Sequence, residues 1–280
     1  MLKLRVITAL ILAPLIIWSV LVFSHRALAI ELGLILTVAA WEWARLSGLQ
    51  TNVARIAFSI AMLLVMLLMT WLLHESMQWL PWILLGNLLW WLVGLLLVVT
   101  FRLTPEKLPV TFNGIDIVLN LLAGVFIIGG AFVALTGLHQ LSDYGAYYIL
   151  ILLLLIWIAD IAAYFTGRKF GRHKLAPRVS PGKTWEGVAG AIVAVILASL
   201  VIGKMMHYPA TDMSLFAVLV VITIGFSILG DLTESLFKRR AGVKDSSQLL
   251  PGHGGILDRI DSLMAAAPVF LLGLIQVGIK

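Results

Sequence analysis

The densest group of chemically active side chains lies between Ser235 and Asp261, in a chain that is otherwise strongly apolar. Asp258 and Asp261 stand three residues apart, so a helix would place them on one face. Asp231, just before this stretch, is expected to approach them from a neighbouring helix. Carboxylates in such a cluster suit Mg²⁺, a hard cation that keeps several waters and bridges substrate phosphates. The pattern therefore predicts a metal site held by Asp231, Asp258 and Asp261, with one or two divalent ions and a monovalent cation as a further candidate.

Cationic and glycine residues in the same stretch indicate a ligand that carries phosphate. Lysine and arginine offer charge to phosphate oxygens, and glycines let backbone N–H groups approach an anion. We expect Lys244 and His253 to join the three aspartates in the catalytic group, with His253 orienting Lys244 or a ligand. The remaining residues predicted to contact or orient substrate here are Lys238, Arg239, Asp245, Gly254, Gly255 and Arg259.

Each of these features also has a simpler structural explanation. Basic residues after a membrane span commonly anchor it on the cytoplasmic side. Asp258 and Asp261 could serve only as negative charges at the start of the last helix, and the glycines could form an ordinary turn. The density of charged residues and glycines favours a catalytic site, because acids, bases and glycines alternate between two apolar helices, where acidic residues are energetically costly.

A second polar segment contains a Gly-Lys-Thr sequence at residues 182–184. A P-loop would require glycine where Pro177 stands, together with a strand-to-helix setting, so we reject that interpretation. A lysine beside flexible backbone can still hold nucleotide phosphates as a point charge. We therefore expect Ser180 and Lys183 to bind substrate. Asp160, near the end of the preceding apolar stretch, is expected to join the metal cluster or the nucleotide pocket.

The composition places these residues in a membrane protein. Hydrophobic residues make up 61% of the 280 residues, charged residues only 12%, and the mean hydropathy is +1.05. A soluble domain carries about 25% charged residues, so the missing charge must be replaced by side chains that face lipid. The chain has no cysteine, which excludes disulfide scaffolds, thiol catalysis and thiolate metal sites.

The elements that must position the polar residues are transmembrane helices. A hydrocarbon core of about 30 Å takes roughly 20 residues of helix. Apolar stretches of this kind lie at about 6–23, 27–46, 54–73, 79–101, 115–137, 146–166, 186–206, 213–236 and 261–279. The first could instead be a secretory signal cleaved near residues 27–29, but it is long enough to span and further spans follow directly.

The prediction is an all-α bundle of about nine spans forming one integral membrane domain over residues 1–280. Within it, residues 1–140 form the N-terminal helices, and residues 141–280 form the helices and cytoplasmic loops that carry the catalytic site. Other polar residues of the spans are given structural roles: Glu42 and Arg45, three residues apart, are expected to form an ion pair. Four histidines of the short outside loops are interpreted as interfacial: His25, His74, His139 and His207.

The orientation follows from the basic residues of the loops. With a cytoplasmic N-terminus and nine crossings, only Arg26, Lys204 and Lys280 of the 20 lysine and arginine residues fall outside. Cytoplasmic loops carry the excess of positive charge, so this partition supports both the span count and the orientation. The two long polar loops, 167–185 and 237–260, then emerge on the same face. In a bacterium this would be the inner membrane, with the active site facing the cytoplasm.

The polar stretch resembles the signature of the phosphatidate cytidylyltransferases, or CDP-diacylglycerol synthases. Ser235 begins a pattern Ser-x-apolar-Lys-Arg, four residues, Lys-Asp, followed by Pro-x-His-Gly-Gly-apolar-x-Asp-Arg-apolar-Asp that ends at Asp261. Every fixed position is filled. The segment from Ser180 to Gly187 is similar to a related element of the same family, Ser-Pro-x-Lys-Thr-x-Glu-Gly.

The resemblance implies that CTP and phosphatidic acid react to give CDP-diacylglycerol and pyrophosphate, for phospholipid biosynthesis. The resemblance also implies a homodimer, and the expected partners include membrane lipids and Mg²⁺. The net charge of +6 does not indicate nucleic acid, because the basic residues are distributed over the cytoplasmic loops of a membrane protein. A transporter of an anionic solute is the main alternative outside this class, although it should carry charge near the midplane of repeated halves. A CTP-dependent lipid kinase is a closer alternative, distinguished by its products. A CDP-alcohol phosphatidyltransferase is disfavoured because its expected Asp-Gly, two residues, Ala-Arg motif is absent.

Overall fold

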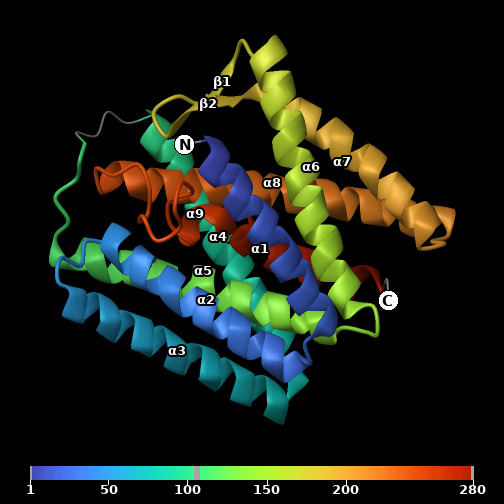
Figure 1. The fold of residues 1–280 in the computed structure, drawn as a ribbon, viewed down its shortest axis with the longest axis horizontal. Coiled ribbons are helices and arrows are strands. Elements are labelled where there is room, and N and C mark those ends of the chain that lie inside the picture. Colours follow the sequence, from blue (N-terminus) through green and yellow to red (C-terminus); the bar gives the residue numbers. More distant parts are fainter. Residues whose placement is uncertain (1, 104–107, 279–280) are drawn as a thin grey trace.

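The protein folds as a bundle of long helices with one small hairpin (Figure 1). The computed structural model describes residues 2–103 and 108–278. Its helices are α1 (Leu2–Val22), α2 (His25–Leu46), α3 (Asn52–Glu75), the short 3₁₀ helix η1 (Met77–Trp79), α4 (Leu80–Leu103), α5 (Gly114–Gln140), α6 (Gly145–Phe170), α7 (Trp185–Met205), α8 (Ala210–Arg240) and α9 (Leu257–Val277). The strands are β1 (Lys174–Ala176) and β2 (Ser180–Thr184).

Each of the predicted apolar stretches forms a helix, which confirms the all-α polytopic membrane fold. Among the described residues, 8 helices are long and apolar enough to cross a membrane. In α1 the apolar helix covers only Leu10–Val22, which is shorter than the other candidate spans. That α1 crosses the membrane therefore remains a prediction. Lys107 and Lys280, which entered the count of basic residues, lie outside the described residues.

Local sequence signals place the ends of several helices. Ser24 accepts a hydrogen bond from the backbone N–H of Ala27 at the start of α2, and Thr51 accepts one from Ala54 at the start of α3. Such caps satisfy N–H groups that have no partner within the helix. Helices α2 and α3 therefore begin at polar residues close to the predicted starts of the second and third apolar stretches.

The most extensive helix packing in the C-terminal half joins α8 and α9 at the centre of the molecule (Figure 1). Gly230 of α8 lies so close to α9 that an added Cβ would come within 2.5 Å of the carbonyl oxygen of Asp261 and 2.9 Å of Ala265 Cβ. Ala265, Ala266 and Ala267 are fully buried. Small residues let the backbones approach closely, and this approach brings the acids of α8 and α9 side by side.

The connections predicted to share the cytoplasmic face meet at one end of the bundle. The backbone N–H of Val110 donates to the carbonyl of Arg240 (2.9 Å), and Arg239 Nε donates to the carbonyl of Val179 (3.2 Å). These bonds join the α4–α5 and α6–α7 connections to the end of α8. The structure thus agrees with the predicted alternation of spans, while the side that faces the cytoplasm remains a prediction.

Two polar segments at this end are named here for later use. The hairpin segment, residues 171–184, contains β1 and β2, which pair antiparallel with Lys174 opposite Thr184. The C-terminal loop, residues 241–256, joins α8 to α9. The hairpin corrects one expectation, because a strand does lead directly into α7. The P-loop remains excluded by Pro177, which lies in the turn between the two strands.

Candidate active site

One face at the end of α8 supplies a row of charged side chains. Asp231, Glu234 and Lys238 are spaced three and four residues apart, so they lie on the same side of the helix. The ammonium group of Lys238 lies between two carboxylates, 2.5 Å from Glu234 Oε2 and 2.7 Å from Asp258 Oδ1. All three side chains are largely buried, at 13% exposed for Lys238, 2% for Glu234 and 5% for Asp258. Burial of such charges is tolerated because they are paired.

Glu234 was not among the predicted site residues. Its Oε1 is buried and has no hydrogen-bond partner in the part of the chain that the structure describes. The signal that could have identified it is its position, one helical turn from both Asp231 and Lys238. With Glu234 and Asp258 both bound to it, Lys238 offers less charge to a substrate phosphate than the sequence alone suggested.

Asp258 is anchored by several donors at once. Its Oδ2 accepts hydrogen bonds from Ser246 N (3.0 Å), Ser246 Oγ (3.0 Å) and Gly255 N (2.8 Å). Gly254 has a φ of +86°, and a Cβ there would lie 2.7 Å from Asp258 Oδ2. The glycines were predicted to let backbone N–H groups approach an anion, and in this structure the anion approached by Gly255 is Asp258.

Glu42 of α2 belongs to the same network and was misassigned from the sequence. Its carboxylate is fully buried and accepts from Ser246 Oγ, Ser247 Oγ and the backbone N–H groups of Ile256 and Leu257. The predicted ion pair with Arg45 is wrong. The described contacts of Arg45 are instead directed to the C-terminal loop, where its Nη1 donates to the carbonyl of Ser246 (3.2 Å). An acid inside an apolar span was the available signal.

The hairpin segment is tied to α8 through one ion pair. Lys183 Nζ lies 2.6 Å from Asp231 Oδ2, while Asp231 Oδ1 accepts a hydrogen bond from Ser235 Oγ at 3.2 Å. Lys183 comes from β2, and Asp231 lies a full span later in the chain. The hairpin segment therefore contacts the face of α8 that carries the acids.

A first cavity, of about 590 Å³, opens beside these acids. Many of the predicted site residues line it: Asp160, Asp231, Lys238, Asp245, Asp258, Arg259 and Asp261. Apolar side chains of α1, α2 and α6 also line it, including Ile16, Leu32 and Ile149, together with the polar Ser19 and Glu31. One cavity is thus bordered both by charged residues and by apolar residues of the spans.

A second cavity, of about 490 Å³, lies between the hairpin segment and α6. Ser180 and Lys183 line it, together with Arg168 and Lys174. Asp160 borders both cavities, and its part in the metal cluster or the nucleotide pocket stays a prediction. The cationic residues that line the second cavity contrast with the acids that line the first.

Other predicted residues border neither cavity. Lys244 is exposed on the C-terminal loop, and Arg239 contacts Val179 of the hairpin segment. The backbone N–H of His253 donates to Leu250, and its buried Nδ1 has no partner among the described residues. The roles assigned to Lys244, Arg239 and His253 remain predictions.

The acids were tested for their fit to a metal ion. Among the described residues, no group of three or more His, Cys, Asp or Glu side chains is placed to hold an ion. Asp258 is engaged by Lys238, Ser246 and Gly255, whereas Asp261 accepts only from the neighbouring N–H of Ser262 (2.7 Å) among its hydrogen bonds. Mg²⁺ commonly uses one or two carboxylates together with waters and substrate phosphates. Asp261 fits that smaller ligand set, and Asp231, which also borders the first cavity, could join it where a cation replaces the contact with Lys183.

The sequence was then compared with known proteins. The profile of the cytidylyltransferase family matches residues 3–275. The chain belongs to this family. A phosphatidate cytidylyltransferase of Haemophilus influenzae is 38% identical over 96% of this chain and 97% of its own length. One of Pseudomonas aeruginosa is 40% identical over 96% of each chain, and one of Brucella suis is 33% identical over 97% of this chain and 92% of its own.

Proposed function

We propose that this protein transfers the cytidylyl group of CTP to phosphatidic acid, releasing pyrophosphate and forming CDP-diacylglycerol for phospholipid biosynthesis. The observation that carries this proposal is the first cavity, which is lined both by the signature acids and by apolar side chains of α1, α2 and α6. A lipid whose phosphate must react while its acyl chains stay in the membrane requires such a cavity. Family membership and the names of the relatives support the same reaction.

The charges of the first cavity support a divalent cation. Its five aspartates exceed its two cationic residues, Lys238 and Arg259, and both proposed substrates are anions. Negative substrates enter an acidic cavity only if cations offset the repulsion. We assign Asp231 and Asp261 as the residues that hold Mg²⁺, with Asp258 beside them. A bound ion of this kind would neutralise charge on the phosphates as the new bond forms.

The hairpin segment is proposed to receive the nucleotide phosphates. Lys183 and Lys174 line the second cavity with Ser180, and lysine binds phosphate as a mobile point charge. Asp160 lies where the two cavities adjoin. This arrangement supports CTP in the second cavity with its α-phosphate directed towards Asp160 and the lipid in the first.

The chemistry requires positioning more than proton transfer. An oxygen of the lipid phosphate attacks the α-phosphorus of CTP, and the bond from that phosphorus to the pyrophosphate oxygen breaks. A phosphate monoester is already ionised near neutral pH, so no general base is needed. Reactions of this type depend on alignment and on stabilisation of charge.

The protein is an integral membrane protein, and we place its site on the cytoplasmic face of the inner membrane. The excess of basic residues in the connections at the site end supports this orientation, as does the availability of CTP in the cytoplasm. The relatives are bacterial. A homodimer, implied by the family resemblance, is part of the same proposal.

The decisive experiment is an assay of purified protein in detergent with CTP, phosphatidic acid and Mg²⁺. We expect CDP-diacylglycerol and pyrophosphate in equal amounts, and neither product when diacylglycerol replaces phosphatidic acid. Formation of CDP and a phosphorylated lipid would instead identify a kinase. Solute flux into vesicles without nucleotide turnover would identify a transporter.

A further inference from the structure

Glu42 of α2 lies far in sequence from the signature residues, yet it accepts three hydrogen bonds from the C-terminal loop, as many as Asp258 does, and a fourth from Leu257 at the start of α9. We propose that Glu42 is a positioning residue of the active site, acting on Asp258 through Ser246 and the first turn of α9. This inference rests on the proposed function, because the reaction it serves is the cytidylyl transfer.

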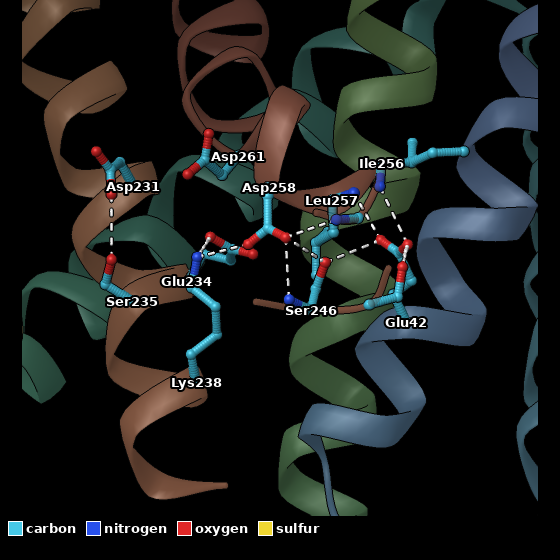
Figure 2. Close-up of polar contacts among 12 residues, drawn as sticks. Glu42, Asp231, Glu234, Ser235, Lys238, Ser246, Ile256, Leu257, Asp258 and Asp261 are labelled. Carbon is cyan, nitrogen blue, oxygen red and sulfur yellow. Dashed lines mark hydrogen bonds and ion pairs between the residues drawn. The ribbon is translucent and has the colours of Figure 1, made fainter. Parts of the chain in front are cut away.

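Both oxygens of the Glu42 carboxylate are fully used (Figure 2). Oε1 accepts from Ser247 Oγ (2.5 Å) and Ile256 N (3.0 Å), and Oε2 accepts from Ser246 Oγ (3.1 Å) and Leu257 N (2.7 Å). No described Lys, Arg or His side chain forms an ion pair with it. The charge is instead stabilised by hydrogen bonds and by the positive end of the α9 dipole. A buried charge satisfied in this way tolerates little movement of its donors.

Ser246 connects Glu42 to the signature acid. Its hydroxyl oxygen lies 3.1 Å from Glu42 Oε2 and 3.0 Å from Asp258 Oδ2. A hydroxyl has one proton to donate, so the two carboxylates share it. Asp258 then contacts Lys238, which contacts Glu234. Figure 2 shows this continuous chain from α2 through the C-terminal loop and α9 to α8.

The two carboxylates also divide the N–H groups at the start of α9. Gly255 N donates to Asp258, whereas Ile256 N and Leu257 N donate to Glu42. A Cβ on Gly255 would lie 2.0 Å from Ser246 Oγ and 2.6 Å from both Glu42 oxygens. Gly255 must therefore be a glycine because Glu42 and Ser246 occupy the space that a side chain would need. Glu42, from the N-terminal half of the chain, thus helps to determine the conformation of the signature segment.

The test is a comparison of Glu42→Gln with wild type in the CDP-diacylglycerol assay. The amide keeps one acceptor and replaces the other with a donor, so part of the first turn of α9 loses its partner. We expect kcat to fall about 100-fold, the size of effect that a displacement of about 1 Å produces, with the KM for CTP within about twofold because the second cavity is untouched. Ser247→Ala, which touches Glu42 but not Asp258, should lower kcat less than about fivefold.

A double-mutant cycle separates positioning from stability. Because Glu42 acts through Ser246, Glu42→Gln should cost much less in a Ser246→Ala background than in wild type. Asn87→Ala is the matched control: Asn87 is buried and donates to the carbonyl of Phe126 (2.6 Å) away from the site. We expect this control to lower Tm while kcat is unchanged.

Several outcomes would overturn the inference. These are wild-type kcat in Glu42→Gln, additive effects with Ser246→Ala, or a loss of kcat in Asn87→Ala equal to that in Glu42→Gln. If Glu42→Gln does not fold, Gly255→Ala keeps every acid and crowds the same contacts, and wild-type kcat in that variant would exclude the proposal. Failure of the proposed function is distinct, since wild-type protein would then form no CDP-diacylglycerol.

Discussion

The hairpin segment and the C-terminal loop lie at the same end of the protein, but they are held in different ways. The hairpin segment is stabilised by its own strand pairing and meets α8 through the Lys183–Asp231 ion pair. The C-terminal loop is held by buried carboxylates, with Ser246 and Ser247 enclosed between Glu42 and Asp258. One segment meets α8 through a partly exposed ion pair, whereas the other is held by several buried hydrogen bonds.

The difference follows from the hydrogen-bonding needs of the backbone. A loop next to a membrane interior must satisfy its N–H groups within the protein. The hairpin segment satisfies them with a second strand. Much of the C-terminal loop has no such partner, apart from an isolated bridge between Leu250 and Gly254, so the carboxylates of Glu42 and Asp258 accept its N–H groups instead.

The largest expected effect comes from removing divalent metal, which should disable both segments together. An excess of chelator should lower CDP-diacylglycerol formation more than about 1000-fold, because acids and anionic substrates then face each other without a cation. Isothermal titration with Mg²⁺ and the recovery of activity on its addition would measure the dependence. Undiminished turnover in chelator would show that Lys183 and the other cations suffice.

The next largest effect is expected from Asp258→Asn, which breaks the arrangement of the C-terminal loop. Removing one partner of a buried charge pair costs about 3–5 kcal/mol, so we expect kcat/KM to fall about 1000-fold and Tm to fall as well. Gln248→Ala in the same loop is the control, since Gln248 is exposed and lines neither cavity. Near-wild-type turnover in Asp258→Asn would remove this residue from the active site.

A smaller and different effect is expected in the hairpin segment. Lys183→Met should raise the KM for CTP about tenfold, an amount typical of one charged contact to phosphate, with a smaller change in kcat. Arg172→Met, an exposed cation of the same segment, should leave both constants within about twofold. A loss confined to kcat would mean that Lys183 acts on Asp231 and not on the nucleotide.

The smallest effect is expected at the surface of the hairpin segment. His173 lies 2.7 Å from Glu186, but its side chain is 79% exposed. Exposed pairs contribute little, so His173→Gln should change kcat/KM less than about twofold, with no measurable change in Tm. A tenfold loss would show that the hairpin segment is as rigidly arranged as the C-terminal loop, and the comparison between them would fail.

The helical fold could be predicted because it depends on features that are local in sequence. Stretches of about 20 apolar residues need no knowledge of their neighbours to be recognised as spans, and the basic residues of the loops grouped the connections that the structure places at one end. The signature residues were equally visible, because they stand close together. The short strands β1 and β2 were missed, since three to five residues carry almost no periodic signal.

The sequence by itself determined the membrane bundle, the family, and the set of acids and cations available to the site. Only the tertiary structure decided which of these groups touch. Glu42 is separated by 204 to 215 residues from its partners in the C-terminal loop and at the start of α9, and its spacing to Arg45 suggested an ion pair that does not form. Lys238 likewise proved to be held by Glu234 and Asp258. Such partners are set by which helices pack together, and helix packing depends on the whole chain rather than on any local pattern.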